Sequence, residues 1–349
     1  MTPLARALLR WYDGAKRDLP WRRDPSPYKT LVSEFMLQQT VVATVGPYFA
    51  RFIARFPDVA TLAAATDEQV TALWSGLGYY ARARNLRRAA AAIVVEHGGV
   101  IPAAEEALRA LPGIGPYTAA AVAALAFDGR AFALDGNTLR VLARLGDDRR
   151  PVDEPATRAA LHARGLAAVP RRRAGDFNQA MMELGALICT PRSPGCDRCP
   201  LAGDCRARAA GTAASLPRKR PRAERAVVCV VCACITDGAR VLVVKRQAGL
   251  LAGTWALPEA ADRGVRARAA LARRLAEAAG VRVAGVAYRG AIRHVFTHRD
   301  VTAELFRVDV DGGDAGPAAS EGRRWVSPAG LAALGVSSFA RKTVALGIG

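Results

Sequence analysis

The chain has 349 residues, which is long enough for two or more domains that each bury a hydrophobic core. Its 51% hydrophobic composition excludes a disordered polymer, and no stretch reaches the roughly 18 uncharged apolar residues of a membrane span. The formal charge of +19 favours a polyanionic partner, with nucleic acid first. The excess of arginine over lysine is also expected of a compositionally biased genome, so charge supports a nucleic-acid partner without deciding it.

The first 210 residues are predicted to be all-helical. Thr2 and Pro3 are typical of a helix start, and Gly14 of its end. Charged residues interrupt the apolar stripe of this helix, which argues against an export signal, with a transit peptide as the minor alternative. Apolar periodicity between Pro and Gly breaks predicts further helices at 28–38, 41–55, 67–75, 82–97, 103–110, 116–127, 137–145, 154–168 and 176–188.

Residues 211–225, GTAASLPRKRPRAER, are predicted to be a basic linker. The pattern then changes to apolar strands at 226–235 and 240–246, joined by a turn that carries the Asp-Gly hairpin signal. A helix is expected at 266–279, where Gly280 ends it. Short strands are expected near 281–288, 291–297 and 301–309. The predicted domains are therefore 1–210, all-α, and 226–349, α+β.

Four of the seven cysteines lie within 17 residues, with the spacing C-x6-C-x2-C-x5-C. Four thiolates this close can surround one soft metal centre. A structural zinc site usually has two close pairs, whereas this spacing has one, so an iron–sulfur cluster is favoured and zinc stays the alternative. An odd cysteine count argues against a disulfide scaffold. The four are Cys189, Cys196, Cys199 and Cys205, and arginines at 192, 198, 206 and 208 can balance their charge.

The motif LPGIGPYTA, at 111–119, places a glycine-rich turn before a helix that begins near Pro116. We expect Gly113 and Gly115 to adopt positive φ and to let the backbone approach a ligand closely. The amides of the turn and of the helix start would then bind a phosphate without reading sequence. The alternative is an ordinary helical hairpin in a bundle.

Two carboxylates stand out. Glu34 lies in the apolar run TLVSEFML, where an unpaired carboxylate is costly unless it is protonated. Burial would raise its pKa and suit it to be a general acid, and a structural ion pair is the equal alternative. Asp135, in ALDGNTLRV, brackets a glycine with Asn137 and can cap the following helix, and this role can coexist with a functional one.

Together these motifs resemble the endonuclease-III-like helix-hairpin-helix superfamily, and specifically the MutY-type adenine DNA glycosylases. The resemblance covers nearly the whole chain. The similar blocks occur in order: LPWR (19–22), SEFMLQQT (33–40), GLGYYARARNL (76–86), LPGIGPYTA, LDGN (134–137), FNQAMMELGALIC (177–189) and the cysteine run. The resemblance implies a 4Fe-4S cluster on the four cysteines.

The resemblance also implies a monofunctional enzyme of base excision repair. Such an enzyme flips adenine out of duplex DNA where it is mispaired with 8-oxoguanine or guanine, and excises it. Glu34 would protonate the adenine ring, and Asp135 would stabilise the sugar cation, electrostatically or covalently. Asn137 and Tyr117 would orient these groups. Because bifunctional relatives carry a lysine at the Tyr117 position, no Schiff base and no strand cleavage are expected.

Further residues are implied in binding DNA. Gln39 and Tyr79 match positions that wedge into the base stack, beside Gln38. Arg22 matches a position near the lesion strand. The implied DNA-binding set is Arg22, Gln38, Gln39, Tyr79, Gly113 and Gly115.

The C-terminal domain resembles the Nudix (MutT-like) fold that this family carries. Arg274 and Ala278 stand where metal-binding carboxylates would be expected and only Glu277 remains, so we expect no nucleotide hydrolysis. In the family, a Phe-Ser-His loop in this domain recognises 8-oxoguanine. The corresponding residues are Phe296, Thr297 and His298, with Thr in place of Ser; a surface histidine is the alternative for His298.

Three other cysteines, Cys229, Cys232 and Cys234, are interpreted as core residues of the first strand instead of a second metal site. The weaker hypotheses for the whole chain are a lyase acting on oxidised pyrimidines, a Nudix hydrolase with a helical accessory domain, and a non-enzymatic damage-binding protein. The preferred interpretation predicts a monomeric enzyme of a bacterial cytoplasm, associated with the nucleoid and not with a membrane.

Overall fold

The structure is a computed structural model that describes residues 1–221, 224–249, 251–262, 268–311 and 322–349. The chain forms two compact units. The helical unit contains Met1–Ala64 and Asn85–Arg222, and the mixed unit contains Ala65–Arg84 and Ala223–Gly349. Part of the predicted linker, at 222–223, and the start of the predicted helix at 266–279 lie outside the described residues.

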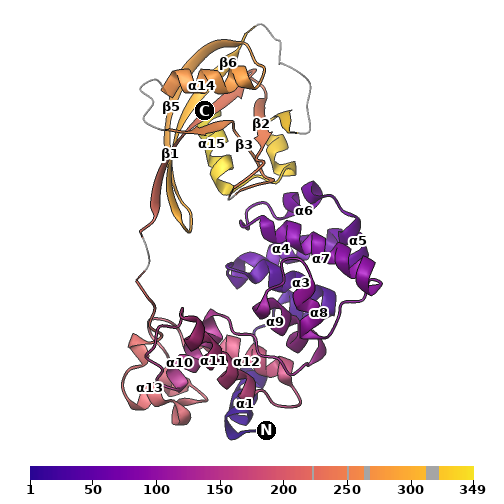
Figure 1. The fold of residues 1–349 in the computed structure, drawn as a ribbon, viewed down its shortest axis with the longest axis vertical. Helices are drawn as coiled ribbons and strands as arrows, with labels where there is room; N and C mark the ends of the chain where they lie inside the picture. Colours follow the sequence, from indigo (N-terminus) through magenta and orange to yellow (C-terminus); the bar gives the residue numbers. More distant parts are fainter. Residues whose placement is uncertain (222–223, 250, 263–267, 312–321) are drawn as a thin grey trace. The chain divides into compact units, whose positions relative to one another are not determined.

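The helical unit is built around one buried helix of small residues, α9 (Pro116–Phe127). Its seven residues from Thr118 to Ala124 are buried, and it packs against α3, α8 and α12 (Figure 1). Alanines allow this close approach on several sides. The other helices of the unit are α1 (Pro3–Ala15), α2 (Pro20–Arg23), α3 (Pro27–Leu37), α4 (Val42–Arg55), α5 (Val59–Ala64), α8 (Glu105–Ala110), α10 (Gly136–Leu145), α11 (Pro155–Ala168), α12 (Ala174–Leu187) and α13 (Arg206–Ala209).

Two of these helices show why the sequence prediction succeeded in this unit. The side chain of Thr2 caps α1 by accepting from the amide of Ala5, as expected, although the helix continues one residue past Gly14. Leu134, just before α10, and Val141, within it, are both buried. The short helices α2 and α5 were not predicted, because four to six residues give no measurable periodicity.

The mixed unit is a seven-stranded sheet with the strand order β3-β2-β1-β6-β5, where β4 pairs with β1 and β7 pairs with β2. The helix α14 (Arg268–Ala278) packs on β1 and β5, and α15 (Ser338–Ile348) packs on β1, β5 and β6. Figure 1 shows both helices beside this sheet. The strands are β1 (Ala226–Thr236), β2 (Val241–Lys245), β3 (Trp255–Ala256), β4 (Glu259–Ala261), β5 (Val283–Val295), β6 (Arg299–Val310) and β7 (Arg323–Val326).

Two expectations for this sheet were wrong. The strands expected at 281–288 and 291–297 form one strand, β5, because register shifts at Val283/Gly285 and Tyr288/Gly290 let it bend without ending. Gly290 has φ 122, which supports such a bulge. Cys229 is exposed, whereas Cys232 and Cys234 are buried as predicted. The first half of β1 is solvent-accessible and only its second half is buried.

The mixed unit also contains residues 65–84, which the periodicity assigned to the all-helical region. This segment includes α6 (Asp67–Leu73), whose N-terminus is closed by a capping box between Thr66 and Gln69. The boundary between the units then falls inside α7 (Ala81–His97). No helix in the described part of the chain is long and apolar enough to cross a membrane.

Candidate active site

Glu34 lies on α3 and its side chain is buried, with 4% of the residue exposed. The Tyr117 hydroxyl, in the first turn of α9, donates to Glu34 Oε2 at 3.0 Å. Burial raises the pKa of Glu34 to about 7, against the smaller lowering effect of Tyr117. Asp135 raises it further and Arg22 lowers it. Burial also raises the pKa of Tyr117 well above its usual value, so the phenol stays a neutral donor.

Asp135 is the N-cap of α10, as one of its two predicted roles requires. Its Oδ1 accepts from the amide of Thr138 at 2.7 Å, and its Oδ2 accepts from Asn137 Nδ2 at 3.0 Å. Each carboxylate oxygen is thus held by a separate donor, while the residue stays half-buried. The negative charge is fixed in place and remains accessible, and both predicted roles are compatible with this geometry.

Arg22 was expected near DNA and lies within the helical unit, where it interacts with two buried carboxylates. Its Nη1 donates to Glu183 Oε1 at 2.7 Å, and its charge acts on Glu34. Arg17 donates to the same Glu183 through Nε at 2.8 Å and Nη2 at 3.1 Å. Two guanidinium groups therefore satisfy Glu183, which is 1% exposed.

The two residues implied in wedging the base stack share an unusual backbone conformation. Gln39 has φ 56 and Tyr79 has φ 50, which is rare for residues with a side chain. Such strain persists only where the surroundings determine it, and it concentrates at functional sites. Next to Gln39, the Gln38 Nε2 donates to Thr118 Oγ1 of α9 at 3.0 Å.

The glycine-rich turn is formed between α8 and α9 as predicted, but its two glycines differ. Gly113 has φ 75, and a Cβ there would lie 2.4 Å from the Cβ of Asn85. Gly115 has φ −86 and is the N-cap of α9, so the expectation of positive φ at this residue was wrong. A Cβ at Gly115 would meet nothing within 4 Å, so the protein's own packing does not require glycine at this position.

The residues implied in reading 8-oxoguanine lie in the turn between β5 and β6 of the mixed unit. The hydroxyl of Thr297 is hydrogen-bonded to the hydroxyl of Tyr79, and both residues are exposed. His298 is also exposed. Phe296 instead packs inward, with its ring centroid 4.5 Å from His294 and 5.8 Å from Phe339. The turn is therefore anchored by Phe296 and presents Thr297 and His298 to solvent.

The four clustered cysteines are half-buried and line one pocket of the helical unit. In the part of the chain that the structure describes, no three Cys, His, Asp or Glu side chains are grouped as a site for a metal ion. Four thiols that line one pocket are the donor set that an iron–sulfur cluster uses. Burial raises the pKa of Cys199 to about 11, so its thiolate needs a positive centre to form.

Arg144 is a functional residue that the sequence analysis missed. It is 1% exposed and donates to the carbonyls of Leu216, Thr190 and Pro191, and to Cys189 Sγ at 3.3 Å. It thereby ties the start of the cysteine loop to the chain that follows it. Arg144 stands between the apolar residues Ala143 and Leu145, and a single charge in one turn of an amphipathic helix is also the pattern of a solvent-facing arginine.

Arg140, one helical turn earlier on α10, was missed for the same reason. Its Nε donates to the Cys189 carbonyl at 2.7 Å, and its Nη2 donates to Asn137 Oδ1 at 2.9 Å and to the Gly185 carbonyl at 2.7 Å. The spacing of 137, 140 and 144 places all three on one face of the helix. The i, i+3, i+7 spacing of these polar residues is a signal in the sequence, but it can be interpreted only when this face of the helix is known to be buried.

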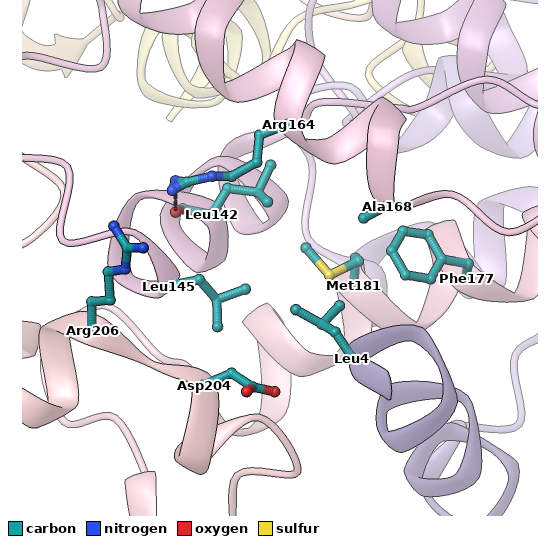
Figure 2. A pocket seen from close by; sticks show the side chains of 9 residues that line it. All are labelled: Leu4, Leu142, Leu145, Arg164, Ala168, Phe177, Met181, Asp204 and Arg206. Atoms are coloured by element: carbon teal, nitrogen blue, oxygen red, sulfur yellow. Dashed lines mark hydrogen bonds between the residues drawn. The ribbon is translucent and has the colours of Figure 1, made fainter. Parts of the chain in front are cut away.

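A separate pocket in the helical unit contains none of the predicted catalytic residues (Figure 2). Apolar side chains of α1, α10, α11 and α12 surround it, and Arg164 and Arg206 lie at its edge. The Arg164 Nη1 donates to the Leu142 carbonyl at 3.3 Å. Glu34 on α3, Tyr117 on α9 and Asp135 at the start of α10 do not line this pocket.

Known proteins resemble this chain along its length. Residues 32–163 match the HhH-GPD superfamily of base excision DNA repair proteins, 189–205 the iron–sulfur binding domain of endonuclease III, and 230–346 a NUDIX domain. The adenine DNA glycosylase of Rattus norvegicus is 36% identical over 94% of this chain and 74% of its own length. That of Homo sapiens is 35% identical over 98% and 73%. The chain belongs to the adenine DNA glycosylase family.

Solved structures agree with this family for the helical unit. A thermostable thymine-DNA glycosylase superposes with a TM-score of 0.54 and 27% identity, over 59% of this chain and 95% of that one. An endonuclease III–DNA complex, at 24% identity and a TM-score of 0.51, shows the same fold. The predictions of a helical glycosylase domain, a Nudix-like domain and an iron–sulfur cluster are therefore confirmed for this adenine DNA glycosylase.

Proposed function

We propose that this adenine DNA glycosylase excises adenine mispaired with 8-oxoguanine or guanine in duplex DNA, without cleaving the strand. The observation that carries the proposal is the pairing of a buried acid, Glu34, with a half-buried fixed carboxylate, Asp135. Glu34 is buried, whereas Asp135 is half-buried. A carboxyl group that donates a proton and a carboxylate that stabilises a cation need two different environments of this kind. Family membership supplies the reaction class of N-glycosyl bond hydrolysis.

Glu34 acts as the general acid. With a pKa of about 7, a large fraction of it is protonated at neutral pH. It transfers that proton to a ring nitrogen of the flipped adenine, which becomes a better leaving group. The bond from C1′ to the base then breaks, and its electron pair leaves with the adenine. The neutral Tyr117 hydroxyl holds Glu34 Oε2 and stabilises the carboxylate left behind.

Asp135 stabilises the positive charge that develops on the sugar. Asn137 and the Thr138 amide hold its two oxygens, so no reorganisation is needed as the charge forms. Water adds to C1′, and Glu34, now a carboxylate, accepts the proton that this water loses. Tyr117 has no amine, so no Schiff base forms and the strand is not cleaved.

The remaining proposed contacts bind and read the DNA. The turn at Gly113 and Gly115 grips phosphate through backbone amides. Gln38, Gln39 and Tyr79 enter the base stack. Arg22 is held by its ion pair with Glu183 and supports the adenine site. Cys189, Cys196, Cys199 and Cys205 would hold the iron–sulfur cluster, which would cross-link the loop. Arg144 holds the start of this loop through Cys189 Sγ.

The test is a set of single-turnover excision assays. Duplexes carry A opposite 8-oxoguanine, A opposite G, and T opposite G as the matched negative control. We expect adenine release from the first two, none of thymine from the third, and strand breaks only after heat or alkali. Absence of adenine release from every duplex would overturn the proposal, and strand cleavage by the enzyme alone would overturn the monofunctional part of it.

A further inference from the structure

The carbonyl of Val336 receives two hydrogen bonds from residues that flank Tyr79 in sequence. Tyr80 Oη donates to it at 2.8 Å and Ser75 Oγ donates at 3.0 Å. Tyr80 and Val336 are buried, with 2% and 1% exposed. A buried carbonyl with two donors is a strong local anchor, because breaking either bond leaves polar groups without water.

The anchor is itself fixed to the sheet. The amide of Trp255 donates to the Gly335 carbonyl at 3.0 Å, and Trp255 forms a parallel bridge with Val336. On the other side, a Cβ added at Gly335 would lie 2.7 Å from Thr71 Oγ1 of α6. Gly335 and Val336, here called the seat, are therefore held between β3 and α6 with no room for a side chain at Gly335.

Two arginines of the mixed unit hold segment 65–84 next to the seat. Arg341, on α15, donates from Nη2 to Ser75 Oγ at 2.9 Å. Arg324, on β7, donates from Nη2 to Glu68 Oε2 at 3.0 Å, and its guanidinium lies 4.8 Å from the Trp255 ring centroid. Segment 65–84 is thus attached to the sheet along its length.

The seat determines where Tyr79 can lie. Tyr80 Oη also accepts from the amide of Gly76 at 3.2 Å, so one hydroxyl connects the Tyr79 loop to the seat. Within the loop, the Gly78 carbonyl accepts from Trp74 Nε1 at 3.2 Å and from Arg82 Nη2 at 3.1 Å. These bonds maintain the positive φ of Tyr79, whose hydroxyl then meets that of Thr297.

We propose that Tyr80, Ser75 and Arg341 are positioning residues that set selectivity for the oxidised base opposite the adenine. They act through the seat by holding the Tyr79 and Thr297 hydroxyls as one pair. This inference rests on the proposed function, in which that pair lies at the base opposite the adenine. Loosening the seat leaves Glu34 and Asp135 untouched, so it lowers discrimination between mispairs more than it lowers excision itself.

The experiment compares Tyr80→Phe with a matched control, Tyr28→Phe. Tyr28 Oη also donates to a buried backbone carbonyl at 2.8 Å, that of Phe56, but in the helical unit. Single-turnover excision rates are measured for A opposite 8-oxoguanine and A opposite G, using the full chain. We expect Tyr80→Phe to lower the ratio of the two rates about fivefold, the size of one net hydrogen bond, and Tyr28→Phe to leave it unchanged.

A second pair of variants keeps the test decisive if Tyr80→Phe folds poorly. Ser75→Ala and Arg341→Gln each remove a bond at the edge of the seat, and the ratio should fall in both. The inference is overturned if the wild type prefers 8-oxoguanine and the seat variants keep that preference, or if Tyr28→Phe lowers it equally. If the wild type releases no adenine, the proposed function itself has failed. This outcome differs from the two outcomes that overturn the inference about the seat.

Discussion

The two regions that carry the proposed activity are built on opposite physical principles. In the helical unit, Glu34 is buried and its pKa is raised to about 7 because water is excluded from it. In the mixed unit, Tyr79 is 40% exposed and Thr297 is exposed, so both hydroxyls can be reached by a ligand. The first region uses burial to change a proton affinity, and the second uses a strained loop to present two ordinary hydroxyls.

This difference indicates how each region fails when it is altered. Removing Glu34 from the buried region is expected to remove most of the excision activity, because the proposed mechanism takes its proton from that residue. Altering the Tyr79–Thr297 pair is expected to change chiefly which base is accepted opposite the adenine. Variants in the helical unit are therefore expected to change rate, and variants at the Tyr79–Thr297 pair to change rate ratios.

The largest effect is expected from Glu34→Gln. The amide keeps the size and neutrality of the protonated acid but has no proton to give, so excision should fall about 10³-fold while DNA binding is retained. Because the folded-state pKa of about 7 exceeds the usual 4.5, Glu34 lowers stability as pH rises from 4.5 through 7. The variant should therefore melt at a higher temperature than the wild type at pH 8. Full excision activity would remove Glu34 from its role.

Asp135→Asn separates the two roles of the α10 N-cap. Asparagine can still accept from the Thr138 amide and cap the helix, but its NH2 group faces the Asn137 donor, so the melting temperature should fall by roughly 2–4 °C. The negative charge facing the sugar is lost, and excision should fall about 10²-fold to 10³-fold. Single-turnover rates and thermal melts of the same preparation check this. A stable variant with wild-type rates would leave Asp135 as a cap alone.

Arg144→Met is expected to weaken the helical unit. Three backbone carbonyls and Cys189 Sγ lose their donor inside the protein, which should lower the free energy of unfolding by about 3 kcal/mol. The purified variant should also lose the absorbance of its iron–sulfur cluster. The control is Arg150→Met, since the Arg150 side chain is 58% exposed and pairs with Asp148 near the surface, at 2.6 Å. Equal losses in both variants would contradict the account.

The smallest effect is expected from Thr297→Ser, which keeps the hydroxyl that meets Tyr79. The ratio of rates for A opposite 8-oxoguanine and A opposite G should stay within about twofold of the wild type. Thr297→Val keeps the shape and removes the hydroxyl, and should lower that ratio about tenfold. The prediction fails if valine is tolerated as well as serine.

The sequence was most informative where function depends on local patterns. Glu34 in an apolar run, the cysteine spacing and the turn before α9 each follow from a few adjacent residues. It was least informative where distant segments meet. Nothing local indicates that Arg140 and Arg144 are buried against the cysteine loop, or that segment 65–84 packs on the sheet through Val336. The single strand β5 was divided in two because a bulge at Gly290 gives the same local signal as a turn.

The pH dependence of single-turnover excision tests the central claim, that a buried Glu34 is the proton donor, most directly. With saturating enzyme and an A:8-oxoguanine duplex, the rate should be constant at acidic pH and fall as pH rises through about 7, because the active form carries the proton. The fall should approach tenfold per pH unit and be absent in Glu34→Gln. A rate that rises through neutral pH, or stays constant to pH 9, would contradict the account.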